Sequence, residues 1–87
     1  MGSYKILIKP SAVKELEGVP ALKDKRKIAE KIRGLAENPR PAGNVKLSGE
    51  EKYRLRHRHF RIVYSIDDEG RIVRVVKIAQ RKEAYRG

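Results

Sequence analysis

From residue 53 onward, apolar and polar side chains alternate with a period of two, and this alternation limits the possible folds more than any other feature. Such a period is typical of strands that bury one face and expose the other. We expect strands over residues 53–57, 60–66 and 71–79, joined by short turns. Three sequential strands with short connections predict an antiparallel sheet.

The first half of the chain follows a different pattern. Residues 4–9 are short and rich in β-branched side chains, which indicates a further strand, and a short helix over residues 11–16 is expected to begin at Ser11 as its N-cap. Residues 21–37 repeat apolar positions with a helical period up to Asn38-Pro39. The predicted fold is therefore α+β, in the order β-α-α-β-β-β. An N-terminal helical hairpin packs on one face of a small, mostly antiparallel four-stranded sheet, and residues 1–87 form a single domain.

The charge balance points to a polyanionic partner. The chain has 22 Lys and Arg against 11 Asp and Glu, and residues 52–61 hold five cations, two histidines and no acid. A solvated face normally mixes both signs, so this run favours nucleic acid or an acidic protein as a partner. The chain has no cysteine, no apolar run long enough to cross a membrane and no secretory signal pattern, which is compatible with a cytoplasmic location. We expect no metal or other cofactor, because His57 and His59 lack neighbouring carboxylates.

The register of the strands decides which cations meet, because directly opposed residues of an antiparallel pair share a face. A two-residue loop at Arg58-His59 places Arg56 opposite Arg61. A three-residue loop at 68–70, with Gly70 in the left-handed region, places Arg61 opposite Lys77 and Tyr64 opposite Arg74.

In this register one face of the sheet is cationic and the other is apolar. One face is expected to carry Arg54, Arg56, Arg61, Lys77 and Arg81. The other is expected to pack against the helices through Tyr53, Leu55, Phe60, Ile62, Tyr64, Ile66, Ile72, Val76 and Ile78. His57 falls on the apolar side, where a structural role is expected, and His59 falls in the loop. Arg81 and Tyr85 are four residues apart, so one helical turn would place the phenol beside the guanidinium.

Four short stretches in this order carry a resemblance to a known family: KLSG (46–49), YRLR (53–56), FRIVY (60–64) and RKEAYR (81–86). The chain resembles the RelE/ParE superfamily of toxins from type II toxin–antitoxin pairs. RelE-like members cleave mRNA in the ribosomal A site without metal, so the resemblance implies a metal-independent endoribonuclease that arrests translation. It also implies three kinds of partner: the ribosome, mRNA, and a small, acidic, RelB-like antitoxin.

The resemblance also implies roles for individual residues. Arg61, Arg81 and Tyr85 match family positions used in catalysis, whereas Arg54 and Arg56 fall where RelE has lysines. Arginine stays protonated, so it can stabilise phosphate charge but cannot act as a general base. The expected catalytic residues are Arg56, Arg61, Arg81 and Tyr85. The expected RNA-binding residues are Lys46, Lys52, Arg54, Arg58, His59 and Lys77.

Two other functions share this fold. ParE-like members inhibit DNA gyrase by binding, without nuclease activity, and a third possibility is an RNA-binding module that has no toxin activity. Cations gathered beside a phenol favour the nuclease, because a protein that only binds another protein does not need them.

Overall fold

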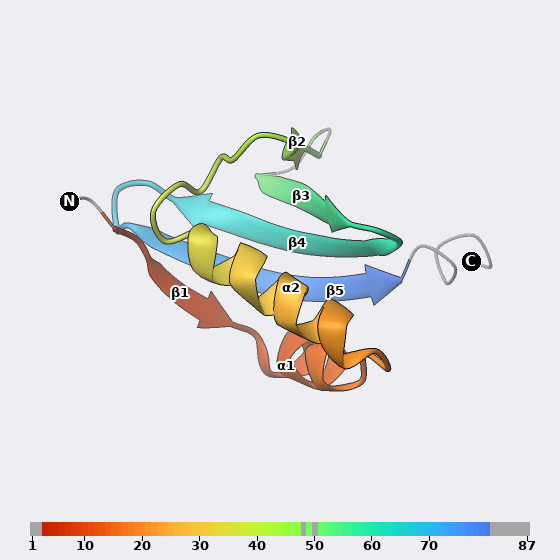
Figure 1. Cartoon of the computed structure of the whole chain (residues 1–87). Helices are drawn as coiled ribbons and strands as arrows, with labels where there is room; N and C mark the ends of the chain where they lie inside the picture. Colours follow the sequence, from red (N-terminus) through yellow and green to blue (C-terminus); the bar gives the residue numbers. More distant parts are fainter. Residues whose placement is uncertain (1–2, 48, 50, 81–87) are drawn as a thin grey trace.

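The computed structural model describes residues 3–47, 49 and 51–80, and its elements follow the predicted order with one addition. The structure contains β1 (Lys5–Ile8), α1 (Pro10–Glu17), α2 (Leu22–Gly34), β2 (Val45–Lys46), β3 (Lys52–His57), β4 (Phe60–Asp67) and β5 (Ile72–Gln80). The short strand β2 is the addition, and its two residues are too few for a period-two pattern to reveal. The α+β class and the helical layer on one face of the sheet are confirmed (Figure 1).

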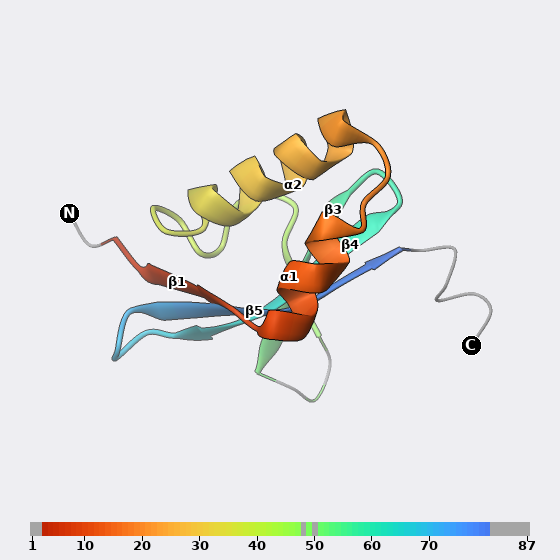
Figure 2. The same ribbon diagram turned by 90° about the horizontal axis from the view of Figure 1, so that it is seen from below.

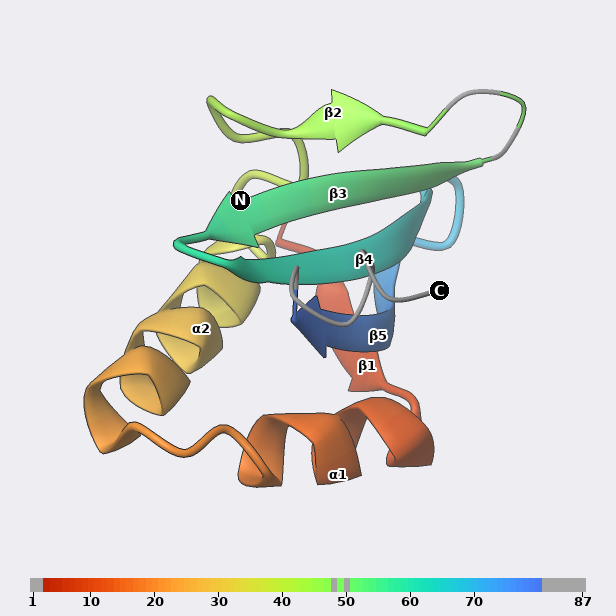
Figure 3. The same ribbon diagram turned by 90° about the vertical axis from the view of Figure 1, so that its right-hand side faces the viewer.

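The five strands form one sheet in the order β1-β5-β4-β3-β2, which Figure 3 shows from bottom to top. β1 is parallel to β5, and the other neighbours are antiparallel. Figure 2 shows α2 lying along one face of the sheet, and neither described helix covers the opposite face. We call this opposite face the open face.

The helix ends differ from the sequence-based expectation. α1 begins at Pro10 with Lys9 at the N-cap, so Ser11 lies inside the first turn and the predicted Ser11 cap is wrong. Proline suits this first position because its φ is already helical and its missing N–H would have no intrahelical acceptor there. α2 ends at Gly34 rather than at residue 37, and the amide of Asn38 donates to the Gly34 carbonyl at 3.1 Å.

The two long hairpins turn differently. The β3–β4 hairpin has the predicted register, with Arg56 opposite Arg61 and Leu55 opposite Ile62. Its loop is the predicted pair Arg58-His59, and Arg58 adopts a positive φ of 56°.

The predicted β4–β5 register is wrong. Asp67 pairs with Ile72 instead of Arg71, and a bulge at Val63/Tyr64 shifts the pairing again, so that Ile62 pairs with Ile78. The left-handed residue is Arg71, with φ 56°, and Gly70 is not in that region. Gly70 serves another purpose, since an added Cβ would lie 2.7 Å from the Asp67 carboxylate.

The shifted register changes which β5 residues form the core. Val73 and Val75 are fully buried against the helices, whereas the predicted core residues Ile72 and Val76 are only half-buried. The core therefore consists of Ala12, Val19, Ile28, Ile32, Leu35, Leu55, Phe60, Ile62, Tyr64, Val73, Val75 and Ile78.

A polar clamp holds the loop after α2 against the end of the sheet where β4 turns into β5. Arg40 binds both carboxylate oxygens of Asp68, at 2.9 and 3.2 Å, and its guanidinium lies 5.4 Å from the centre of the Tyr53 ring. Tyr4 donates a hydrogen bond to Asp68 at 2.8 Å. The Arg40 hydrogen bonds, helped by Tyr4, lower the pKa of the Asp68 carboxyl. This clamp stabilises the part of the molecule farthest from the β3–β4 hairpin.

Candidate nucleic-acid interface

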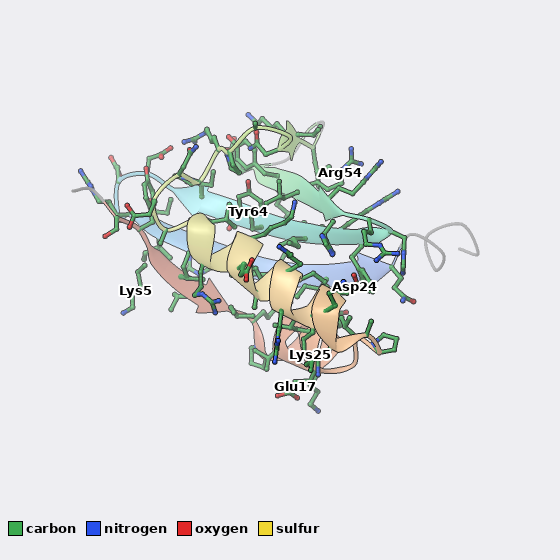
Figure 4. The ribbon with its side chains drawn as sticks, viewed as in Figure 1. Lys5, Glu17, Asp24, Lys25, Arg54 and Tyr64 are labelled. Carbon is green, nitrogen blue, oxygen red and sulfur yellow. The ribbon has the colours of Figure 1, made fainter. Side chains whose placement is uncertain are left out.

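The open face brings together three arginines from β3 and β4, which we call the guanidinium cluster: Arg54, Arg56 and Arg61. Arg56 is directly opposite Arg61, and Arg54 is opposite Val63, one step along the same face. Figure 4 marks the position of Arg54 on β3. Alternation places these side chains outward because Leu55 and Ile62 point into the core. The sequence-based prediction of this grouping is confirmed.

The cluster is electrostatically unfavourable in isolation. Like charges directly opposed across an antiparallel pair destabilise the sheet, and Arg56 and Arg61 are such a pair. The Nε atom of Arg61 is also buried and has no hydrogen-bond partner among the described residues. The acid that the described strands place on this face is Asp67, at the far end of β4, where it accepts a hydrogen bond from Gly70. An anion bound at the cluster would relieve the repulsion between the guanidinium groups.

Lys77 lies on the open face as predicted, but it does not oppose Arg61. Because the register is shifted, Arg61 opposes Ala79, and Lys77 opposes Val63. The Lys77 ammonium lies 3.3 Å from a carboxylate oxygen of Glu15 on α1, and the other Glu15 oxygen accepts a hydrogen bond from the Ile78 amide at 2.8 Å. Glu15 thus accepts a hydrogen bond from the part of β5 that extends past its neighbour β1. Its carboxylate also partly neutralises the charge of Lys77.

Two further cations on the open face, Arg74 and Lys5, were not found by sequence reasoning. Arg74 opposes Ser65 and is exposed, and it shares this face with Lys52, which also opposes Ser65 from β3. Lys5 of β1 opposes Ile72 on the same side. The predicted register had placed Arg74 opposite Tyr64 in the core, and a charge on the apolar face was the signal that this register was wrong.

Lys46 lies elsewhere. It is opposite Tyr53 on the short edge strand β2, so the register places it on the helix side of the sheet and apart from the cluster. Its role as an RNA-binding residue stays a prediction.

Arg58 and the two histidines also lie away from the cluster. His57 Nε2 is 3.1 Å from Asp24 Oδ1, and Arg58 lies 3.5 Å from the same oxygen. Asp24 belongs to the first turn of α2 and is 7% exposed (Figure 4). The His59 ring packs against Phe60 with centroids 4.5 Å apart. These contacts join α2 to the β3–β4 hairpin, so His57 lies in a contact that stabilises the fold.

The remaining predicted residues lie outside the described part of the chain. Arg81 and Tyr85 follow the last described residue of β5, so their positions relative to the cluster stay predictions. Within residues 3–47, 49 and 51–80, no group of three His, Asp or Glu side chains could hold a metal ion. None of the described helices combines the length and apolar character needed to cross a bilayer.

The chain thus combines an α+β fold with one helix-covered face and one arginine-rich open face. Residues 6–85 match the family described as the ParE toxin of type II toxin–antitoxin systems, parDE, and the chain belongs to this family. No curated sequence matches it significantly.

Solved structures support the same assignment. The RelE–RelB complex from the archaeon Pyrococcus horikoshii OT3 is similar with a TM-score of 0.81 and 26% identity, covering 91% of this chain and 96% of that one. The isolated Escherichia coli RelE toxin is similar with a TM-score of 0.77 and 25% identity, covering 97% of both chains. A YoeB/ParE toxin from Agrobacterium tumefaciens shares the fold, with a TM-score of 0.75 and 20% identity over 87% of this chain and 96% of that one.

Proposed function

We propose that the chain is a ribosome-dependent mRNA endonuclease that acts as the toxin of its pair. The observation that carries this proposal is the direct opposition of Arg56 and Arg61, with Arg54 beside them, on a face that no described helix covers. Such a repulsive arrangement is a cost to the folded protein, and binding of a phosphate by the cluster would offset it. The likeness to RelE structures supports the same choice.

The proposed reaction is an internal transfer of the phosphoryl group. The ribose 2′-oxygen attacks the adjacent phosphorus, the bond to the 5′-oxygen breaks, and the products are a 2′,3′-cyclic phosphate and a free 5′-hydroxyl. A base takes the proton of the 2′-hydroxyl, and the departing 5′-oxygen receives a proton. Charge builds on the nonbridging oxygens, where fixed guanidinium groups stabilise the transition state.

We assign roles within this reaction as follows. Arg56 and Arg61, together with Arg81, bind the phosphate and stabilise the transition state. Tyr85 takes part in proton transfer, because the arginines cannot act as a base. Lys52, Arg54 and Lys77 contact the RNA backbone on either side. Removing one transition-state donor typically lowers a rate by about 10²–10³.

A cognate antitoxin completes the proposal. Several similar structures are complexes of RelE with RelB, including those from P. horikoshii and E. coli. With a formal charge of +11, this chain suits a small acidic partner that folds onto its basic surface. The proposal places the toxin in the cytoplasm, where ribosomes and antitoxin are found.

Gyrase inhibition is the second candidate, and the match to the ParE family favours it. Two assays on the same purified protein distinguish the two functions. We expect cleavage of mRNA in a translation extract, mapped by primer extension, and unchanged supercoiling by gyrase. Inhibited supercoiling with intact mRNA would replace the nuclease proposal with the gyrase one.

A further inference from the structure

A second basic surface lies on the outer side of α2, away from the sheet. Asp24, Ile28 and Ile32 are the buried residues of this helix. The exposed side, which we call the α2 surface, carries Lys23, Arg26, Lys27, Glu30 and Arg33. Four cations and one acid give this surface a net charge of +3. From residue 23 to residue 33 it extends for about 15 Å along the helix axis.

The acids of α2 neutralise this surface only in part. Asp24 turns inward to His57 and Arg58, and Glu30 pairs with Lys27 at 3.8 Å. Lys23, Arg26 and Arg33 form no ion pair with any described residue. Three cations therefore remain in solvent along one helix, and their charge is available to an external anion.

The chemistry of the surface favours a nucleic-acid backbone over a protein. A shallow hollow of about 420 Å³ is lined by Leu22, Lys23, Arg26, Lys27 and Glu30. Leu22 is 59% exposed and is the one large apolar side chain there. Protein interfaces have an apolar, often aromatic centre and are depleted in lysine, which this surface does not match. Phosphate contacts need only positioned cations.

We propose that the α2 surface binds the phosphate backbone of RNA, independently of the guanidinium cluster on the open face. Ile28 and Ile32 face the core from α2, and the sheet separates them from the cluster. The two basic surfaces therefore point in opposite directions, and one molecule can hold two RNA segments at once. This inference goes beyond the proposed function, because it concerns binding and does not require cleavage.

The test measures binding of a 2′-O-methyl RNA hexanucleotide, which cannot be cleaved through its 2′ position. The full-length protein is compared with three double variants. Lys23→Gln/Arg26→Gln changes the α2 surface, Arg54→Gln/Arg56→Gln changes the cluster, and Lys14→Gln/Arg71→Asn is a matched control outside both surfaces. Asparagine is chosen at position 71 because it tolerates the positive φ found there. Circular dichroism confirms that each variant is folded.

Native mass spectrometry should find two hexanucleotides on the wild type and on the control, and one on each of the other variants. The α2 variant should also lower the slope of log Kd against log salt by about 1.4, since two phosphate contacts are lost. An α2 variant that still binds two hexanucleotides with the wild-type slope overturns the proposal. If that variant instead loses affinity for a polyglutamate peptide while RNA binding is unchanged, the partner of this surface is an acidic protein, and the RNA proposal is wrong. None of these readouts depends on nuclease activity, and the α2 variant should bind one hexanucleotide fewer than the wild type whether or not the cluster binds RNA, so failure of the proposed function leaves the test intact.

Discussion

Replacing Arg61 with methionine should stabilise the protein and inactivate it at the same time. Methionine has a similar length and packs flexibly, so it keeps the apolar stem of Arg61 while it removes the guanidinium. The change abolishes the repulsion between Arg56 and Arg61, which costs about 0.2–1 kcal/mol for a directly opposed pair. It also removes the buried Nε donor, which has no partner among the residues that the structure describes, and such a group typically costs about 1–3 kcal/mol.

The expected gain in the free energy of unfolding is therefore about 1 kcal/mol or more. In a domain of this size each kcal/mol raises Tm by roughly 4–8 °C. Urea and thermal unfolding measure this gain, and primer extension in a translation extract measures the activity, which should fall about 10²–10³-fold.

A matched control is Arg74→Met, also on the open face. Arg74 opposes Ser65 and is exposed, so its removal should change stability by less than about 0.5 kcal/mol. If Arg61→Met lowers the unfolding free energy, Arg61 has a structural role and the reasoning about the cluster is refuted. If stability rises while cleavage is unchanged, the cluster is strained but does not take part in catalysis.

Three further predictions concern the structure that supports the open face. Asp24→Ala should lower the free energy of unfolding by about 1–3 kcal/mol in urea titrations, because His57 loses its partner in a poorly exposed site, whereas the exposed Glu30→Gln should change it by less than about 0.5 kcal/mol. Equal effects of these two changes would contradict the account of the α2 junction. Tyr64→Phe should cost about 0.5–1.5 kcal/mol in the same assay, because the buried hydroxyl donates to the Pro39 carbonyl at 2.8 Å, and an unchanged stability would mean that this bond contributes nothing. The lowered pKa of Asp68 means that its contribution is present above the unfolded pKa of about 3.9 and is lost as pH falls through the lower folded value, so Asp68→Asn should flatten the acid side of a Tm-against-pH curve. An acid limb as steep as in the wild type would exclude this carboxylate as its source.

The first hairpin could be predicted from sequence because two independent signals agree there. Only an even loop at Arg58-His59 keeps Arg54 and Arg56 out of the core, and the same loop aligns Leu55 with Ile62. The cost of burying charge therefore determines the register. The register in turn places the three arginines of the guanidinium cluster on one face.

The second hairpin could not be predicted in the same way, because its glycine has a different purpose. Gly70 leaves room for the Asp67 carboxylate, and the left-handed position is filled by Arg71. A bulge then adds Val76 to β5, which no alternation in the sequence reveals. The displacement of Lys77 toward Glu15 follows from this shift and depends on a contact between residues 62 positions apart.

The most direct test of the central claim is the NMR signal of the arginine Nε–H groups during titration with the non-cleavable hexanucleotide. The Nε of Arg61 has no partner within the described part of the chain, so its signal should shift strongly when RNA binds, together with those of Arg54 and Arg56. The signal of Arg58, which faces Asp24 on the helix side, should stay in place. If Arg58 shifts while the three cluster arginines do not, the open face is not the RNA site and the account is contradicted.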